Sequence, residues 1–146
     1  MPIKRLLVCV DGSKYSEEAV RYAVDIAKGF DSTISLIFVW TPPASAGQEM
    51  GIPYDIPASE MERLKGAKEI LEAAGLKYNI VKAIGNPAEE ILDESRKGYD
   101  QVILGSRGLG SVERFLLGSV TGRVSHHITI PMTIIPPKRE EKKGPF

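Results

Sequence analysis

Two glycine-serine segments in the carboxyl-terminal part of the chain have the residue types and spacing of an anion-binding site. The first, Gly105-Ser106-Arg107-Gly108, follows an apolar run, and nine residues separate it from the second, Gly118-Ser119. Glycines directly after a buried strand let backbone N–H groups approach a ligand without intervening side chains. A Gly-Ser at a helix start adds unpaired N–H groups and the positive end of the helix dipole. Two such elements suit a polyphosphate better than a single carboxylate.

Residues of these segments can be given roles toward phosphate groups. Backbone N–H groups around Gly108 and Gly118-Ser119 would surround the phosphates, with the Ser119 hydroxyl as an extra donor. Arg107 would add a bidentate contact. Each residue also has a structural interpretation: ordinary turn and cap glycines, a helix-capping serine, and an arginine that is solvated without ligand. The functional interpretation therefore depends on the spacing of the whole set.

Two further candidates lie outside the glycine segments. Asp11 follows the first apolar run and is a reasonable acceptor for a ribose hydroxyl, although capping the first helix or ordering its turn is an equally good explanation. Val39, near the end of the second apolar run, would offer main-chain groups and an apolar wall to a base. Together these residues suggest a nucleotide rather than a simple anion.

The elements that must position these residues are predicted from alternating apolar runs and helical patterns, which indicate a parallel sheet with crossover helices. The predicted strands span residues 3–10, 33–40, 77–84, 100–105 and 132–135. The first and fourth are nearly continuous in apolar residues, as central strands are, while the third alternates like an edge strand. We expect one open five-stranded parallel sheet of order 3-2-1-4-5, a Rossmann-like α/β fold with helices on both faces. Its ligand crevice lies beyond strands one and four, where the order reverses.

Helix boundaries follow from caps and stops. The predicted helices are residues 16–28 stopping at Gly29, a helix with the capping box Ser59/Glu62 that ends at Gly75, a helix from Asn86-Pro87 that stops before Gly98, and residues 119–127. Residues 41–58 are proline-bearing and read as a long loop that could lie over a ligand. We assign residues 1–137 to one domain and residues 138–146 to a charged, flexible tail.

Composition narrows the function classes. The 146 residues carry 19 basic and 19 acidic side chains, a formal net charge of zero, which argues against nucleic acid as a partner. No apolar run approaches the roughly 20 residues that cross a bilayer, and the start lacks a signal-peptide pattern, so we expect a cytoplasmic protein away from membranes. The lone Cys9 sits within an apolar run and is expected to be a small buried hydrophobe.

Other site motifs fail on spacing. The chain has neither the G-x-G-x-x-G dinucleotide fingerprint at its glycine segment nor a Walker A lysine. Adjacent His126 and His127 point in different directions around a helix, so metal ligation is not expected there. No nucleophile elbow of the form G-x-S-x-G occurs.

The chain resembles the ATP-binding subgroup of the universal stress protein family. The resemblance runs from Val10-Asp11-Gly12-Ser13 to the last strand, and its most specific element is Gly, two residues, Gly, nine residues, Gly and Ser or Thr, which this sequence satisfies at 105, 108, 118 and 119. It implies an ATP-binding α/β domain, with ADP or AMP as alternatives and Mg²⁺ or Mn²⁺ as companion ion. By matching position it also adds Gly105 and Val120 to the phosphate and ribose cradle. Members often pair through their last strands, which makes Met132 to Ile135 the expected homodimer edge.

These features favour a stress-response protein that acts as a nucleotide-dependent switch, with an unknown protein partner and at most slow ATP hydrolysis. No convincing general base can be named, and hydrolysis needs a positioned water and charge neutralisation. Two alternatives remain: a dimeric interaction module that requires no nucleotide, and a slow nucleotide hydrolase or adenylate-forming enzyme in which Asp11 is the one plausible catalytic group.

Overall fold

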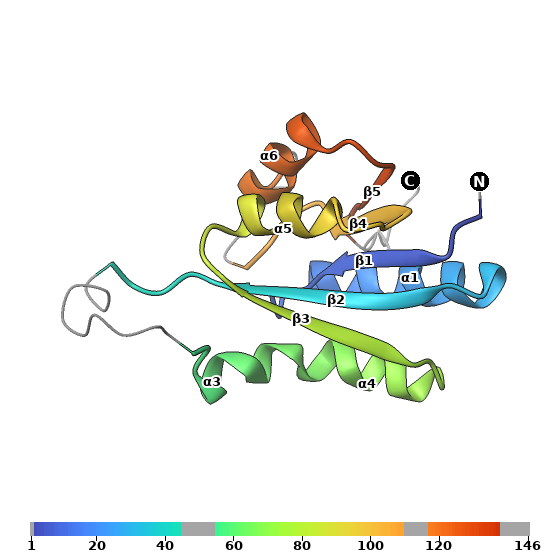
Figure 1. The fold of residues 1–146 in the computed structure, drawn as a ribbon. Coiled ribbons are helices and arrows are strands. Elements are labelled where there is room, and N and C mark those ends of the chain that lie inside the picture. The colour runs from blue at the N-terminus through green and yellow to red at the C-terminus, as the bar shows by residue number, and fades with distance from the viewer. Residues whose placement is uncertain (1, 45–54, 110–116, 138–146) are drawn as a thin grey trace, which may run out of the picture.

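The computed structural model describes residues 2–44, 55–109 and 117–137, and contains one all-parallel sheet (Figure 1). Its strands are β1 (Arg5–Cys9), β2 (Thr33–Trp40), β3 (Tyr78–Ile84), β4 (Gln101–Gly105) and β5 (Met132–Ile135). They lie in the order β3-β2-β1-β4-β5, which confirms the predicted topology. β2 and β5 match their predicted bounds, whereas β1 is shorter than predicted at both ends.

Helices connect the strands and cover both faces of the sheet. They are α1 (Lys14–Phe30), α3 (Ala58–Met61), the 3-10 helix η1 (Glu62–Leu64), α4 (Lys65–Ala73), α5 (Pro87–Ser95) and α6 (Ser119–His127). The structure confirms the predicted start of α5, where the Asn86 side chain accepts a hydrogen bond from the Glu89 N–H at 3.1 Å. It also confirms the bounds of α6.

Three of the predicted helices have wrong boundaries. α1 begins two residues early because Ser13 caps it, and it continues through Gly29 to Asp31, whose φ of 55° ends the helix. Ser59 and Glu62 form no capping box: Pro57 precedes α3, no side chain caps it, and Glu62 already belongs to η1. α5 ends at Ser95, three residues before Gly98. A cap residue was thus recognisable by type, but local hydrogen bonding decided which candidate is used.

Alternation along the strands divides the core into two layers. Leu6 and Val8 of β1 face the layer made with α1, η1 and α4, in which Val20 and Leu64 are fully buried. Leu7, between them, faces the layer made with α5 and α6. Figure 1 shows α1 and α4 on one side of the sheet and α5 and α6 on the other. Because side chains alternate along a strand, β1 needs apolar residues at successive positions to serve both layers.

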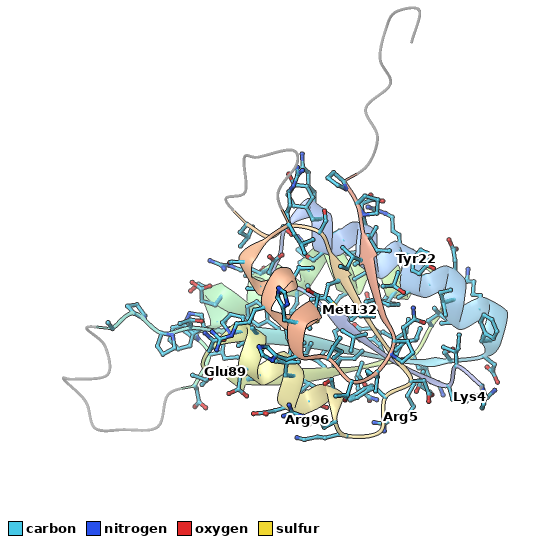
Figure 2. The ribbon with its side chains drawn as sticks, turned by 90° about the horizontal axis from the view of Figure 1, so that it is seen from above. Lys4, Arg5, Tyr22, Glu89, Arg96 and Met132 are labelled. Atoms are coloured by element: carbon cyan, nitrogen blue, oxygen red, sulfur yellow. The ribbon has the colours of Figure 1, made fainter. Side chains whose placement is uncertain are left out.

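The amino-terminal ends of β1 and β4 are joined by one carboxylate. Asp100 accepts hydrogen bonds at 2.9 Å from the backbone N–H groups of Lys4 and Arg5. These two bonds lower the pKa of Asp100 from its usual value. Lys4 and Arg5 lie at the end of the sheet seen on the right of Figure 2. The carboxyl ends of β1 and β4 line the cavity described next. Within the part of the chain that the structure describes, no helix is long and apolar enough to cross a membrane.

Candidate functional site

A cavity of about 820 Å³ lies where the sheet order reverses, beyond the carboxyl ends of β1, β2 and β4. This volume is within the range of small-molecule sites. All eight residues proposed from the sequence line it, namely Asp11, Val39, Gly105, Arg107, Gly108, Gly118, Ser119 and Val120. Residues up to 109 positions apart in the chain therefore share one cavity, as the topological switch-point rule predicts.

The amino-terminal end of α6 forms one wall of the cavity. Thr121 is buried, and its hydroxyl donates to the Gly105 carbonyl at 2.8 Å, which ties the first turn of α6 to the end of β4. The first N–H groups of a helix have no partner within it, so Ser119 and Val120 present donors and a positive dipole end at this wall. Ser119 is the first helical residue and Gly118 is the cap, so Ser119 does not cap the helix.

Gly118 plays a different part from the one predicted. Its N–H donates to the Ser106 carbonyl at 2.7 Å, and a Cβ added there would lie 3.2 Å from the Arg107 Cα. The predicted phosphate donor is therefore engaged within the protein. Gly118 instead allows the start of α6 to approach the loop after β4 closely.

Arg107 is the most unusual group in the wall. Only 8% of the residue is exposed, and its Nε is buried without a hydrogen-bond partner. Among the described residues no carboxylate forms an ion pair with it. The expectation of a solvated side chain is therefore wrong. Burying a cation without an anion is costly, so this geometry favours an anionic partner in the cavity.

Asp11 organises the loop between β1 and α1. Its Oδ1 accepts the Ser13 N–H at 2.9 Å, and its Oδ2 accepts the Leu109 N–H at 3.2 Å. Ser13, rather than Asp11, caps α1. Asp11 thus orders its own turn and also bridges to the segment after β4. Each carboxylate oxygen can accept a further hydrogen bond, so both contacts leave capacity for a hydroxyl of a ligand.

The glycines at 105 and 108 are required by close approaches of different kinds. A Cβ at Gly105 would lie 2.8 Å from the backbone carbonyl of Tyr15, so this glycine lets α1 pack against β4. A Cβ at Gly108 would lie 2.6 Å from Asp11 Oδ2, so this glycine makes room for the carboxylate. One glycine serves packing of the fold and the other serves the cavity.

The opposite side of the cavity is apolar. Ile37 and Val39 of β2 line it together with Pro87 and Ile91 of α5, giving a surface that suits a flat base. Cys9 also lines this cavity and is half-buried. Burial, with a smaller contribution from Asp11, raises the pKa of its thiol, which keeps the sulfur uncharged at neutral pH.

The cavity wall also includes residues that were not among the proposed site residues. Trp40, Thr41 and Pro43 continue β2 into the loop predicted over a ligand, and Thr41 is held by donating to the Gly85 carbonyl at 2.7 Å. Residues 45–54 of that loop lie outside the described residues. Glu60 and Arg63 of α3 and η1 carried no sequence signal, and the packing of Met61 and Leu64 against the core shared with α1 brings them to the cavity.

The described residues offer no ready metal centre. Within residues 2–44, 55–109 and 117–137, no group of three or more His, Cys, Asp or Glu side chains could hold an ion. Two carboxylates, Asp11 and Glu60, line the cavity. A companion ion would therefore have to take most of its ligands from a phosphate-bearing molecule and water.

Comparison with known proteins places this architecture in a family. The model of the universal stress protein family matches residues 2–136. A universal stress protein of Methanocaldococcus jannaschii is 34% identical over 145 residues, which cover 94% of this chain and 85% of the relative.

Solved structures share the fold. A universal stress protein in complex with cAMP has a TM-score of 0.69 and 22% identity, with 93% of this chain and 98% of that chain covered. The Archaeoglobus fulgidus universal stress protein in complex with dAMP has a TM-score of 0.69 and 21% identity, with 92% and 99% covered. With its sheet order, its glycine spacing and a family match over nearly its whole length, the chain belongs to the universal stress protein family.

Proposed function

We propose that this protein binds an adenine nucleotide, ATP or alternatively ADP or AMP, in the cavity at the switch point. The observation that carries this proposal is the buried Arg107, whose Nε has no partner, beside the amino-terminal end of α6. A guanidinium and a helix amino terminus together attract phosphate more strongly than either does alone. No anion of the described residues meets this arginine, so a ligand phosphate is its natural counterion.

The lining residues divide the proposed ligand into three parts. The base packs against the apolar side, where Val39 also offers main-chain groups. The ribose lies at Asp11, whose carboxylate accepts a hydroxyl hydrogen bond. The phosphates lie between Arg107 and the first N–H groups of α6 at Ser119 and Val120. Gly105 and Gly118 support this cradle by packing rather than by donating.

The relatives support the adenine class. Two universal stress proteins of similar fold were solved with cAMP and with dAMP. Both ligands combine an adenine with a single phosphate, which matches the apolar and cationic sides of this cavity. A companion Mg²⁺ or Mn²⁺ would be held mainly by nucleotide phosphates and water, with Asp11 as the carboxylate in the cavity wall nearest the proposed ribose and phosphates.

We further propose a cytoplasmic, stress-related switch in which nucleotide occupancy alters contacts with a protein partner, rather than an efficient enzyme. Rapid hydrolysis requires a group that orients the attacking water. Both oxygens of Asp11 accept backbone N–H groups, and Glu60 is ion-paired with Arg63 at 3.1 Å. These engagements favour binding with slow turnover at most.

The first test is direct. Mass spectrometry of material released from denatured purified protein is expected to show an adenine nucleotide, and titration calorimetry at millimolar ATP with magnesium is expected to give heat of binding. Adenosine should bind more weakly because it offers Arg107 no phosphate. Absence of heat with ATP, ADP and AMP would overturn the proposal. Equal affinity for adenosine and AMP would remove the phosphate site from it.

We also propose that two copies pair through β5. This strand lies at the edge of the sheet and is bonded on one side to β4, so its other side presents backbone groups to a partner. Its four residues, Met132–Ile135, are only half-buried. Light scattering at high concentration should give twice the 16.0 kDa chain mass. A monomer at every concentration would contradict this pairing.

A further inference from the structure

Four charged side chains of the described residues line the cavity, namely Asp11, Glu60, Arg63 and Arg107, and the first three already have partners in the protein. Asp11 accepts two backbone N–H groups, and Arg63 Nη2 lies 3.1 Å from Glu60 Oε2. Arg107 alone among these four is unpaired within the described residues. One arginine balances a monophosphate, but a triphosphate carries several more negative charges. Arg63 is the second cation in the described wall, so its state matters for a longer phosphate chain.

The position of Arg63 is set by a close backbone approach. Gly12 has a φ of 89°, and a Cβ added to it would lie 2.8 Å from the Arg63 Cβ and 3.3 Å from its Cα. Gly12 directly follows Asp11, whose Oδ2 accepts the Leu109 N–H. The stem of Arg63 therefore rests against the turn that reaches the segment after β4. This contact brings a residue of η1 to the side of the cavity where we place ribose and phosphates.

The Arg63–Glu60 ion pair is suited to exchange. The side chains are 45% and 27% exposed, so water screens the pair and little free energy holds it together. Glu60 Oε2 is itself buried and accepts no hydrogen bond, although Arg63 Nη2 lies 3.1 Å away, so the geometry of the pair is not optimal. A phosphate approaching this wall would repel the Glu60 carboxylate and attract the Arg63 guanidinium. Rotation of the long, half-exposed Arg63 side chain would carry the guanidinium to the phosphate without moving the helix, and Glu60 would remain as a repelling charge.

We propose that Arg63 leaves Glu60 to bind the outer phosphates of a nucleoside triphosphate, and that this exchange makes the site prefer triphosphate to monophosphate. The inference rests on the proposed nucleotide site and adds a specificity-determining residue to it. Glu60 acts in the opposite sense, because it competes with the ligand for Arg63 and repels its charge. The pair thus sets how strongly affinity depends on the number of phosphates.

The experiment measures dissociation constants of AMP and ATP, with magnesium, for wild type, Arg63→Gln and Glu60→Gln. We expect Arg63→Gln to raise the dissociation constant of ATP about fivefold and to change that of AMP by less than about twofold. This is the size expected for the loss of one partly exposed charge contact. Glu60→Gln should lower the dissociation constant of ATP about threefold, because Arg63 is then free to bind phosphate and the carboxylate that repels the phosphate is gone. The opposite signs at two neighbouring positions separate this role from general damage to η1.

A matched control is available on α5. Arg96 Nη1 and Asp93 Oδ1 form a second i,i+3 pair at the same 3.1 Å, and neither residue lines the cavity. Figure 2 shows Arg96 at the end of α5 away from Glu89. Arg96→Gln and Asp93→Asn should leave the dissociation constants of AMP and ATP unchanged. Circular dichroism of every variant checks that the fold is kept.

The outcomes distinguish this inference from the proposed function. If Arg63→Gln lowers the affinities for AMP and ATP equally, the inference is overturned. It is also overturned if Glu60→Gln lowers the affinity for ATP. In both cases the proposed nucleotide binding itself would stand. Unchanged binding in both variants would also overturn the inference. Failure of wild type to bind any nucleotide would instead remove the proposed function and this inference with it.

Discussion

Replacing Arg107 with methionine is expected to change ATP affinity and ligand-free stability in opposite directions. ATP binding should weaken about 100-fold, because a nearly buried charge contact with phosphate is worth several kcal/mol when one partner is removed. The free energy of unfolding of the ligand-free protein should rise by about 1–2 kcal/mol, because methionine fills similar space and removes a buried charge that lacks a counterion. Titration calorimetry and denaturant unfolding without ligand provide the two numbers.

An exposed arginine provides the control for this substitution. Arg21 on α1 is 54% exposed and pairs with Glu18. Arg21→Met should change ATP affinity little and stability by less than about 0.5–1 kcal/mol. If Arg107→Met leaves ATP affinity intact, the guanidinium does not meet the phosphates. If it lowers the stability of the ligand-free protein, the arginine has an internal role that outweighs the cost of its burial.

Two glycines of the same motif should respond differently to alanine. Gly105→Ala is expected to lower the free energy of unfolding by about 2 kcal/mol, because the added Cβ meets the Tyr15 backbone at 2.8 Å and α1 must shift. Gly108→Ala should cost less than about 1 kcal/mol, because the obstructing atom is the end of the Asp11 side chain. Gly108→Ala should nevertheless lower the affinity for ATP about tenfold, because Asp11, the proposed ribose acceptor, must turn away from the Leu109 N–H.

Denaturant unfolding and nucleotide titration of the two alanine variants test this separation. Gly29→Ala is the matched control, because Gly29 lies within α1 and a Cβ there meets nothing within 4 Å. It should raise stability by about 0.5–1 kcal/mol through helix propensity. A larger stability loss for Gly108→Ala than for Gly105→Ala would reverse the assigned roles. If Gly108→Ala leaves the affinity for ATP unchanged, Asp11 does not contact the ligand.

Much of the fold was predictable because local and global signals agree along this chain. Continuous apolar runs mark β1 and β4 as central, and alternation marks β3 as an edge, which leads to the observed order. The boundaries were less secure. Gly29 reads as a helix stop, but Asp31 takes the left-handed conformation, and Ser59 lacks the cap bond that its type predicts. Several residues compete for each cap, and hydrogen bonding in the folded chain selects one.

By itself, the sequence determined the part of the cavity wall that the strand ends and the glycine motif supply. Strand order and motif spacing place Asp11, Val39 and the glycine segments at one edge, because the carboxyl ends of parallel strands meet where the order reverses. Only the tertiary structure decided what each residue does there. Burial turned Arg107 from a surface side chain into an unpaired cation, and close approaches made Gly105 and Gly118 packing residues. Arg63 reached the cavity through helix packing alone, because desolvation and contact depend on neighbours that sequence spacing does not specify.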